Sequence, residues 1–113
     1  MFKLKRVYEA PSPDDGVRVL VDRLWPRGVT KARAALDLWL KDIGPSTALR
    51  KWFDHDPAKW SGFQDRYAKE LEGRTALVDE LRRKERQGTV TLLYAARDEE
   101  HNEAAALKAF LDK

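Results

Sequence analysis

The chain has no cysteine among its 113 residues. This excludes a disulfide scaffold, a thiolate-ligated metal centre and a cysteine nucleophile, and it is consistent with a reducing cytoplasm, which is the expected location. Long apolar runs are also lacking. None approaches the roughly 20 residues that cross a bilayer, so no membrane partner is expected. The amino terminus, MFKLKRVYEA, alternates apolar and basic residues, unlike a signal peptide.

Several well-known motifs are missing as well. The sequence has no glycine-rich phosphate loop, no GxGxxG, no GxSxG and no HExxH. It also lacks a recognisable helix-turn-helix spacing. These absences argue against the common nucleotide-cofactor folds, and no cofactor is expected. Asp54, His55 and Asp56 are of metal-ligand type, but residues adjacent in sequence rarely all point inward, so no metal site is expected.

The length indicates one domain spanning residues 1–113. The net charge is +3, and the positive excess lies in the first third of the chain. Residues 1–35 hold eight Lys/Arg against four Asp/Glu, whereas the remainder holds fourteen against fifteen. This asymmetry favours anionic ligands, although an ordinary solvated surface explains an imbalance of this size more often than not.

Apolar patterning predicts three strands and a fourth segment of less certain type. The three strands are expected over Lys3–Glu9, Val17–Leu24 and Thr89–Ala95, with Pro26 ending the second because proline cannot donate to a sheet ladder. Alternation of apolar and polar residues over 36–40 favours a half-buried strand, with a helix as the alternative.

Capping signals predict helices between and after these strands. Four capping residues are expected, namely Thr30 before 31–35, Ser46, Asp56 followed by a proline, and Asp98 before the last helix. Gly73 is expected to end one helix in the left-handed conformation, and Gly88 to end the next. The sum is a small α/β domain, three-layer-like, in which helices flank a three- to four-stranded, at least partly parallel sheet.

Two strand ends concentrate polar chemistry. The segment VLVDRLWPRG (residues 19–28) begins as a buried strand and ends with two arginines, a carboxylate and a tryptophan. The second polar segment, residues 97–102, follows the buried strand TVTLLYA. Ligands of open α/β sheets bind beyond the carboxyl ends of the strands. If these two strands are parallel neighbours, both segments contribute to one pocket.

The side chains in these segments suggest roles in binding an anion. Arginine offers a forked set of donors that suits phosphate or carboxylate, and histidine serves as a general acid or base near neutral pH. The candidate catalytic residues are His101, Asp22 and His55, and the candidate ligand-binding residues are Arg23, Trp25, Arg27, Arg97 and Asn102.

Each candidate also has a plain structural interpretation. Asp98 is expected to act only as a helix cap. Asp22 and one arginine are as readily a structural ion pair as a binding site. His101 in the first turn of a helix fits a surface or packing residue, and Trp25 fits packing against the helices as well as stacking on a ligand.

Three blocks of the sequence resemble a known family. VLVDRLWPRG, LDLWLKDIGPSTALRKWFDHDPAKW and TLLYAARDEEHNEA are similar to the YeaO-like branch of the bacterial family called domain of unknown function 488, and the match covers almost the whole chain. The resemblance implies a compact α/β fold and a cytoplasmic protein, without implying an activity. The positions that match the family are Asp22, Arg23, Trp25, Pro26, Arg27, Gly28, Trp39, Pro45, Ser46, Trp52, Phe53, His55, Asp56, Pro57, Arg97, His101 and Asn102.

Other branches of this family carry a cysteine and a histidine–arginine pair after the corresponding last strand. Here that place holds residues 94–97, Tyr-Ala-Ala-Arg, followed by His101 and Asn102. Because no cysteine is present, thiol chemistry cannot be transferred to this chain.

The leading hypothesis is a pocket at the carboxyl ends of the strands that binds or acts on a phosphorylated or carboxylated small molecule. The first alternative is a nucleic-acid binding module, based on the basic first third with Trp25 and Trp39. The second is a protein–protein interaction module formed by exposed aromatic residues. The residues leave open whether the protein is an enzyme and what its oligomeric state is.

Overall fold

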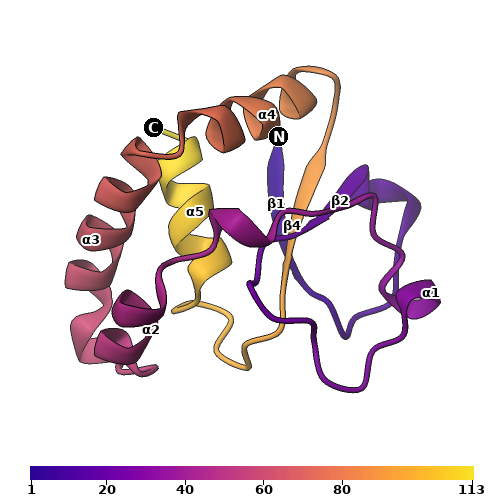
Figure 1. Ribbon diagram of the computed structural model, residues 1–113. Helices are drawn as coiled ribbons and strands as arrows, with labels where there is room; N and C mark the ends of the chain where they lie inside the picture. The colour runs from indigo at the N-terminus through magenta and orange to yellow at the C-terminus, as the bar shows by residue number, and fades with distance from the viewer.

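The sheet has four strands, all parallel. In a computed structural model that describes residues 1–113, the strands are β1 (Phe2–Arg6), β2 (Val17–Leu20), β3 (Leu38–Trp39) and β4 (Val90–Tyr94). Their spatial order is β1-β4-β2-β3, so the last strand of the chain lies between the first two (Figure 1). The parallel register pairs Val19 of β2 with Leu92 of β4.

Helices cover the two faces unequally. The helices are α1 (Lys31–Ala34), α2 (Thr47–Phe53), α3 (Trp60–Glu72), α4 (Thr75–Arg86) and α5 (Glu103–Leu111). The last four gather on one side of the sheet, and α1 lies on the other (Figure 1). This arrangement confirms the predicted α/β class. None of these helices has the length and apolar character that crossing a membrane requires.

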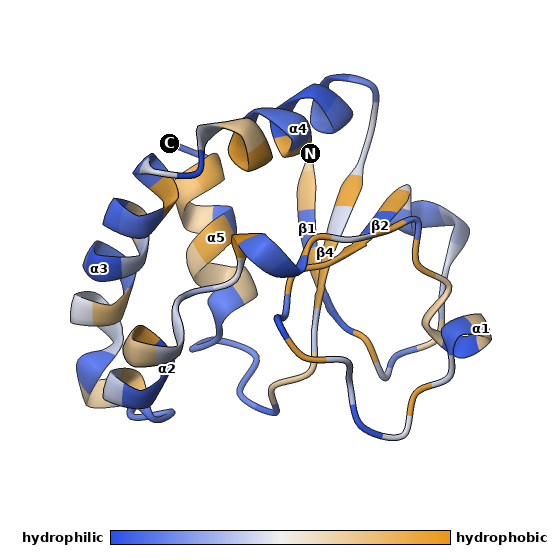
Figure 2. Ribbon diagram, viewed as in Figure 1, coloured by the Kyte–Doolittle hydropathy of each residue, from blue (hydrophilic) through white to orange (hydrophobic).

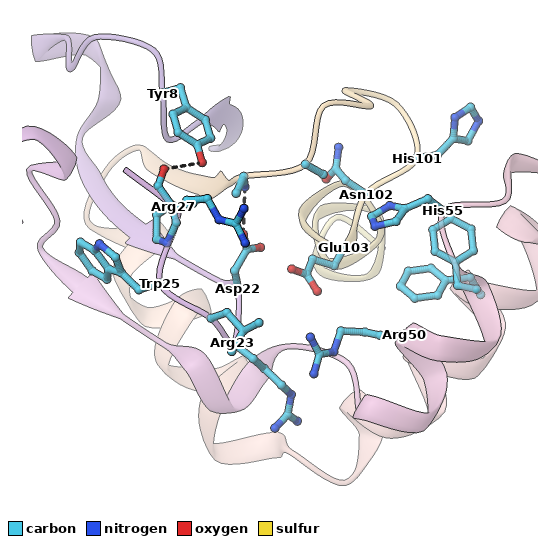
Figure 3. Close-up of a pocket in the computed structure, with 16 residues that line it drawn as sticks. Tyr8, Asp22, Arg23, Trp25, Arg27, Arg50, His55, His101, Asn102 and Glu103 are labelled. Carbon is cyan, nitrogen blue, oxygen red and sulfur yellow. Dashed lines mark hydrogen bonds between the residues drawn. The ribbon is translucent and has the colours of Figure 1, made fainter. Parts of the chain in front are cut away.

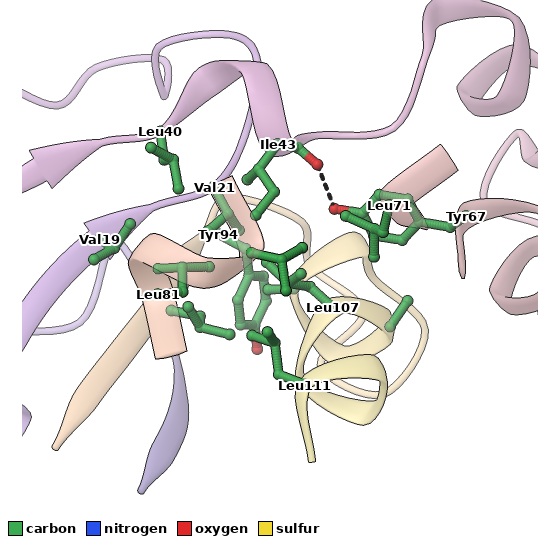
Figure 4. Packing of buried hydrophobic residues seen from close by; sticks show 14 of the residues in the cluster. Val19, Val21, Leu40, Ile43, Tyr67, Leu71, Leu81, Tyr94, Leu107 and Leu111 are labelled. Carbon is green, nitrogen blue, oxygen red and sulfur yellow. Dashed lines mark hydrogen bonds between the residues drawn. The ribbon is translucent and has the colours of Figure 1, made fainter. Parts of the chain in front are cut away.

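The core has two parts because successive residues of a strand point to opposite faces. On the face of α2–α5, Val19 and Val21 pack with Tyr67, Leu107 and other side chains in a cluster of 19 buried residues (Figure 4). Leu20 points the other way, into a cluster of five buried residues. Figure 2 shows the apolar strands at the centre and hydrophilic outer turns on α3 and α4.

The strands are shorter than the sequence predicts. β1 ends at Arg6, and β2 ends at Leu20, six residues before the proline that was expected to stop it. The predicted strand over 36–40 contracts to the two residues of β3. β2 stops early because the Asp22 carboxylate, rather than a backbone carbonyl, accepts a hydrogen bond from the backbone N–H of Ala95 at 2.9 Å.

Three predicted helix caps are confirmed. The Thr30 hydroxyl accepts a hydrogen bond from the backbone N–H of Arg33 at 3.1 Å, and the Ser46 hydroxyl accepts one from Leu49 at 3.1 Å. The Asp56 carboxylate caps a short 3-10 turn that leads directly into α3. Each side chain satisfies a donor that the first helical turn leaves without a backbone partner.

Two predictions about helix ends are wrong. Gly73 has a φ of −86°, so it does not end α3 in the left-handed conformation. Asp98 caps a turn instead of the last helix, accepting hydrogen bonds from the backbone of Glu100 and His101. Asn102 is an equally suitable cap, and its side chain accepts a hydrogen bond from Ala105. The helix therefore begins at Glu103 and places that carboxyl group in its first turn.

Candidate functional site

A cavity of about 410 Å³ lies at the carboxyl ends of β1, β2 and β4. Its lining comes from residues 22–27 after β2, residues 95–96 after β4, and residues 101–103 at the start of α5, with α2 and α3 closing the remaining side (Figure 3). Because β2 and β4 are parallel neighbours, the two polar segments meet at one place. The volume falls in the range of small-molecule sites, about 300–1,000 Å³.

Asp22 forms part of the cavity wall and is only 9% exposed. One carboxylate oxygen, Oδ2, accepts the hydrogen bond from Ala95 that ends β2. The other, Oδ1, is buried and has no hydrogen-bond partner. The structural ion pair considered for Asp22 is therefore not formed. The position of Asp22 is fixed further by its backbone oxygen, which accepts a hydrogen bond from the Trp39 indole at 2.7 Å.

Glu103, in the first turn of α5, faces Asp22 across the cavity (Figure 3). Burial raises the pKa of Glu103 well above its ordinary value, and the negative charge of the neighbouring Asp22 carboxylate raises that pKa further. Arg50 and Arg23 oppose the rise only in part. The pair consequently tends to hold a proton, because two facing carboxyl groups in a partly dry site resist ionising together.

The raised pKa predicts how stability depends on pH. Since Glu103 binds its proton more tightly in the folded state, its contribution is complete below the unfolded value of about 4.5. That contribution is lost as pH rises toward the folded pKa. In urea titrations from about pH 4.5 to about pH 8, the Glu103→Gln variant should therefore gain stability relative to the parent as pH rises.

The control for this titration is Glu100→Gln, which changes an exposed carboxylate in the neighbouring loop. Its difference from the parent should stay flat across the same pH range. A Glu103→Gln difference that is equally flat contradicts the inference that the Asp22–Glu103 pair retains a proton.

Three arginines approach the cavity in different ways. Arg50 extends from α2 toward the two carboxyl groups (Figure 3), and its buried Nε–H has no hydrogen-bond partner. Arg27 lies exposed at the cavity edge. Arg23 lines the cavity but its guanidinium donates to the backbone oxygens of Gly44 and Pro45, so it braces a loop. The Arg50 guanidinium also donates from Nη2 to the Thr47 hydroxyl at 3.2 Å, so its Nε–H and the exposed Arg27 guanidinium are the donors left for an anion.

The other residues predicted to bind a ligand occupy different positions. Arg97 is exposed and does not line the cavity. Trp25 lines it, but the indole donates to the Val29 oxygen at 2.6 Å and meets Trp39 edge-on at 5.4 Å. Asn102 also lines the cavity, and its buried amide is used in capping α5. Its binding role, like that of Trp25, stays a prediction.

The two histidines point to different surroundings. His55 is exposed at the cavity rim, next to Phe53 at a ring distance of 6.4 Å. His101 contributes to the lining, but its ring is held 3.0 Å from the Asp98 carboxylate and 5.3 Å from the Trp60 ring. In Figure 3 that ring turns away from Asp22 and the arginines. No group of three metal-ligating side chains occurs in the structure.

Two charged residues of the cavity lining, Arg50 and Glu103, are absent from the residues predicted from the sequence. Arg50 lies one helical turn before Phe53, and both residues line the cavity. Because residues three apart on a helix share a face, the position of Phe53 is the sequence feature that indicates Arg50. Glu103 was overlooked because the helix was expected to begin four residues earlier, after Asp98. Choosing Asn102 as the cap would have placed this carboxyl group at the same edge as Asp22.

Comparison with known proteins agrees with the sequence blocks described above. A protein of Escherichia coli K12 titled uncharacterized protein YeaO is 41% identical over 110 residues, which cover 97% of this chain and 96% of that protein. An uncharacterised protein of Mycobacterium tuberculosis is 42% identical over 110 residues, covering 97% of this chain and 92% of its own. No solved structure matches.

The family model that matches is described as the inactive DUF488-N3 subclade, and it aligns with residues 1–113. The match spans every strand and helix of the sheet domain and all three blocks that carry the resemblance. The chain therefore belongs to the DUF488 family, in the branch that includes the similar YeaO protein.

Proposed function

We propose that the cavity binds a phosphorylated or carboxylated small molecule. The observation that carries this proposal is the Nε–H of Arg50, which is buried in the cavity wall without a partner. A buried donor left unsatisfied costs about 1–3 kcal/mol. An anion seated beside Arg50 would satisfy that donor, and Arg27 at the edge supplies a second guanidinium.

The place in the fold supports the same function. In parallel sheets, ligands bind beyond the carboxyl ends of the strands, where loops from neighbouring strands diverge. Here β4 inserts between β1 and β2, and residues following all three strands line the cavity. Phe53 and Phe63 add an apolar wall with ring centroids 4.4 Å apart.

Binding without turnover fits the site better than catalysis. The subclade of the matched family is described as inactive. The ring of His101, one of the candidates for acid–base catalysis, is engaged by Asp98 and Trp60 rather than by the carboxyl pair. The cavity then holds a ligand by charge and shape, and supplies no free imidazole at its centre.

Titration with inorganic phosphate and with benzoate, followed by amide and indole NMR signals, tests the proposal. We expect saturable shifts at the Trp25 indole and the Glu103 amide. Arg50→Ala and Arg27→Ala should each weaken binding by about tenfold or more, the loss typical of a charge-assisted hydrogen bond. Arg27 is exposed, so its replacement leaves the fold intact even if Arg50→Ala perturbs α2.

Arg97→Ala is the matched control because it removes the same charge from a neighbouring loop outside the cavity. Its affinity should equal that of the parent. The proposal is overturned if neither anion gives saturable shifts, or if Arg97→Ala weakens binding as much as Arg27→Ala does. The second result would mean that only the general positive charge attracts the anion.

A further inference from the structure

Two buried side-chain polar atoms in this protein lack a hydrogen-bond partner, and both belong to residues that line this cavity. One is the acceptor Oδ1 of Asp22 and the other is the donor Nε–H of Arg50. Buried polar groups are nearly always paired, so an unpaired one calls for an explanation. A ligand that carries both a donor and an acceptor would satisfy these two groups of opposite polarity together.

The geometry points to an amphoteric ligand: we propose that it carries a planar N–H cation, an amidinium or guanidinium, seated on Asp22 and Glu103, with its anionic group on Arg50. The part of this proposal that concerns the anionic group rests on the proposed function. The part that concerns the cation is new and depends on Asp22 and Glu103, which we call the acid pair.

The acid pair is suited to a cation rather than to a neutral group. Asp22 is nine-tenths buried and keeps one free oxygen, and Glu103 faces it (Figure 3) without an ion pair to any arginine or lysine. A guanidinium donates to two carboxylates through fixed, coplanar N–H groups. It would replace the retained proton and let both carboxyl groups ionise.

The adjoining walls favour a flat ligand. Phe53 and Phe63 present stacked rings on the α2–α3 side of the cavity, and delocalised cations are attracted to aromatic faces. The cavity volume of about 410 Å³ accommodates a single substituted ring. A short aryl ligand with opposite charges at its two ends is therefore the simplest probe that addresses the acid pair and Arg50 together.

The test compares three probes in calorimetric titrations of the intact protein: 4-guanidinobenzoate, benzoate and phenylguanidinium. We expect 4-guanidinobenzoate to bind about tenfold tighter than benzoate or more, the gain typical of a charged hydrogen bond. Glu103→Gln should remove this gain, so that 4-guanidinobenzoate and benzoate bind the variant with equal affinity. Glu100→Gln, which alters an exposed carboxylate nearby, should preserve the gain.

Proton release gives a second readout that a merely structural role of Glu103 would not produce. The titratable and charged groups around Glu103 are Asp22, Arg23, Arg50 and Tyr67. Since the cation displaces the proton of the pair, the affinity for 4-guanidinobenzoate should rise as pH rises toward the raised pKa of Glu103, whereas benzoate should show no such rise. Titrations in buffers of different ionisation enthalpy measure the proton directly.

The outcomes separate this inference from the proposed function. Equal affinity for 4-guanidinobenzoate and benzoate, or a gain that survives Glu103→Gln, overturns the part that concerns the cation and leaves the anion site standing. Binding of phenylguanidinium without binding of either carboxylate overturns the proposed function, and the amphoteric ligand with it. Asp22→Asn is avoided because Asp22 also fixes the backbone of Ala95.

Discussion

Replacing Arg18 with alanine is expected to lower the free energy of unfolding by about 3–5 kcal/mol, the usual cost of removing one partner of a buried ion pair. The Arg18 side chain is 6% exposed and pairs with Asp15, whose side chain is 7% exposed. It also donates to the backbone oxygens of Ala35 at 3.0 Å and Ala34 at 2.8 Å.

The loss is large because several buried groups lose their partner together. Asp15 would keep only Lys5 and the backbone N–H of Ser12, while the oxygens at the end of α1 would lose their donors. Arg33→Ala, in exposed α1, is the control and should change stability by less than about 0.5 kcal/mol. Urea unfolding measures both. An Arg18→Ala loss as small as the control's would mean that water replaces the guanidinium.

The loss of stability at acidic pH provides an independent check on the Arg18–Asp15 pair. Burial opposes ionisation of Asp15, but hydrogen bonds from Ser12, Lys5 and Arg18 lower its pKa below the ordinary value of 3.8. A depressed pKa gives stability that is present above the unfolded value and is lost as pH falls through the folded one. The parent should therefore lose this contribution below about pH 3.8, and Arg18→Ala should lose less there.

Replacing Gly16 with alanine should destabilise the protein by about 2–4 kcal/mol through backbone strain and a lost sheet hydrogen bond. Gly16 has φ 62° and ψ −134°, a conformation open almost only to glycine. A Cβ at this position would overlap the Thr89 carbonyl oxygen and lie 2.9 Å from its carbon. That oxygen accepts the first hydrogen bond from β2, donated by Val17 at 3.0 Å.

Gly28→Ala is the control that measures the cost of backbone strain without a steric overlap. Gly28 has a comparable φ of 77°, but nothing lies within 4 Å of a Cβ there. It should cost only about 1–2 kcal/mol, the penalty for a left-handed residue. Thermal unfolding compares the two, and Gly16→Ala should melt several degrees lower, at roughly 4 °C per kcal/mol. Equal melting temperatures would show that β2 and β4 separate readily at this end.

The sequence predicts the fold well because its signals are local. The caps at Thr30, Ser46 and Asp56 and the continuous apolar run of β4 each depend on neighbouring residues, and the structure contains all of them. Strand ends were predicted less well. The end of β2 is decided by a contact between Asp22 and Ala95, which are 73 positions apart, and no local pattern reveals such a contact.

The sequence predicts which polar segments line the cavity more readily than it predicts every residue of the lining. Convergence of the segments after β2 and β4 follows from the rule for parallel sheets, and Asp22 and Arg27 line the cavity. The two possible caps before the last helix, Asp98 and Asn102, are equally good by residue type. Choosing the first hid Glu103, which enters the site only because α5 begins at that residue.

A crystal structure of the protein with 4-guanidinobenzoate would show whether the cavity binds an amphoteric ligand between the acid pair and Arg50. We expect density for one ligand in the cavity after β2 and β4, with its carboxylate within hydrogen-bond distance of Arg50 and its guanidinium between Asp22 and Glu103. The same crystal with benzoate should show a carboxylate at Arg50 alone. Ligand density outside this cavity, with Arg50 Nε still unpaired at saturating concentration, would contradict the proposal.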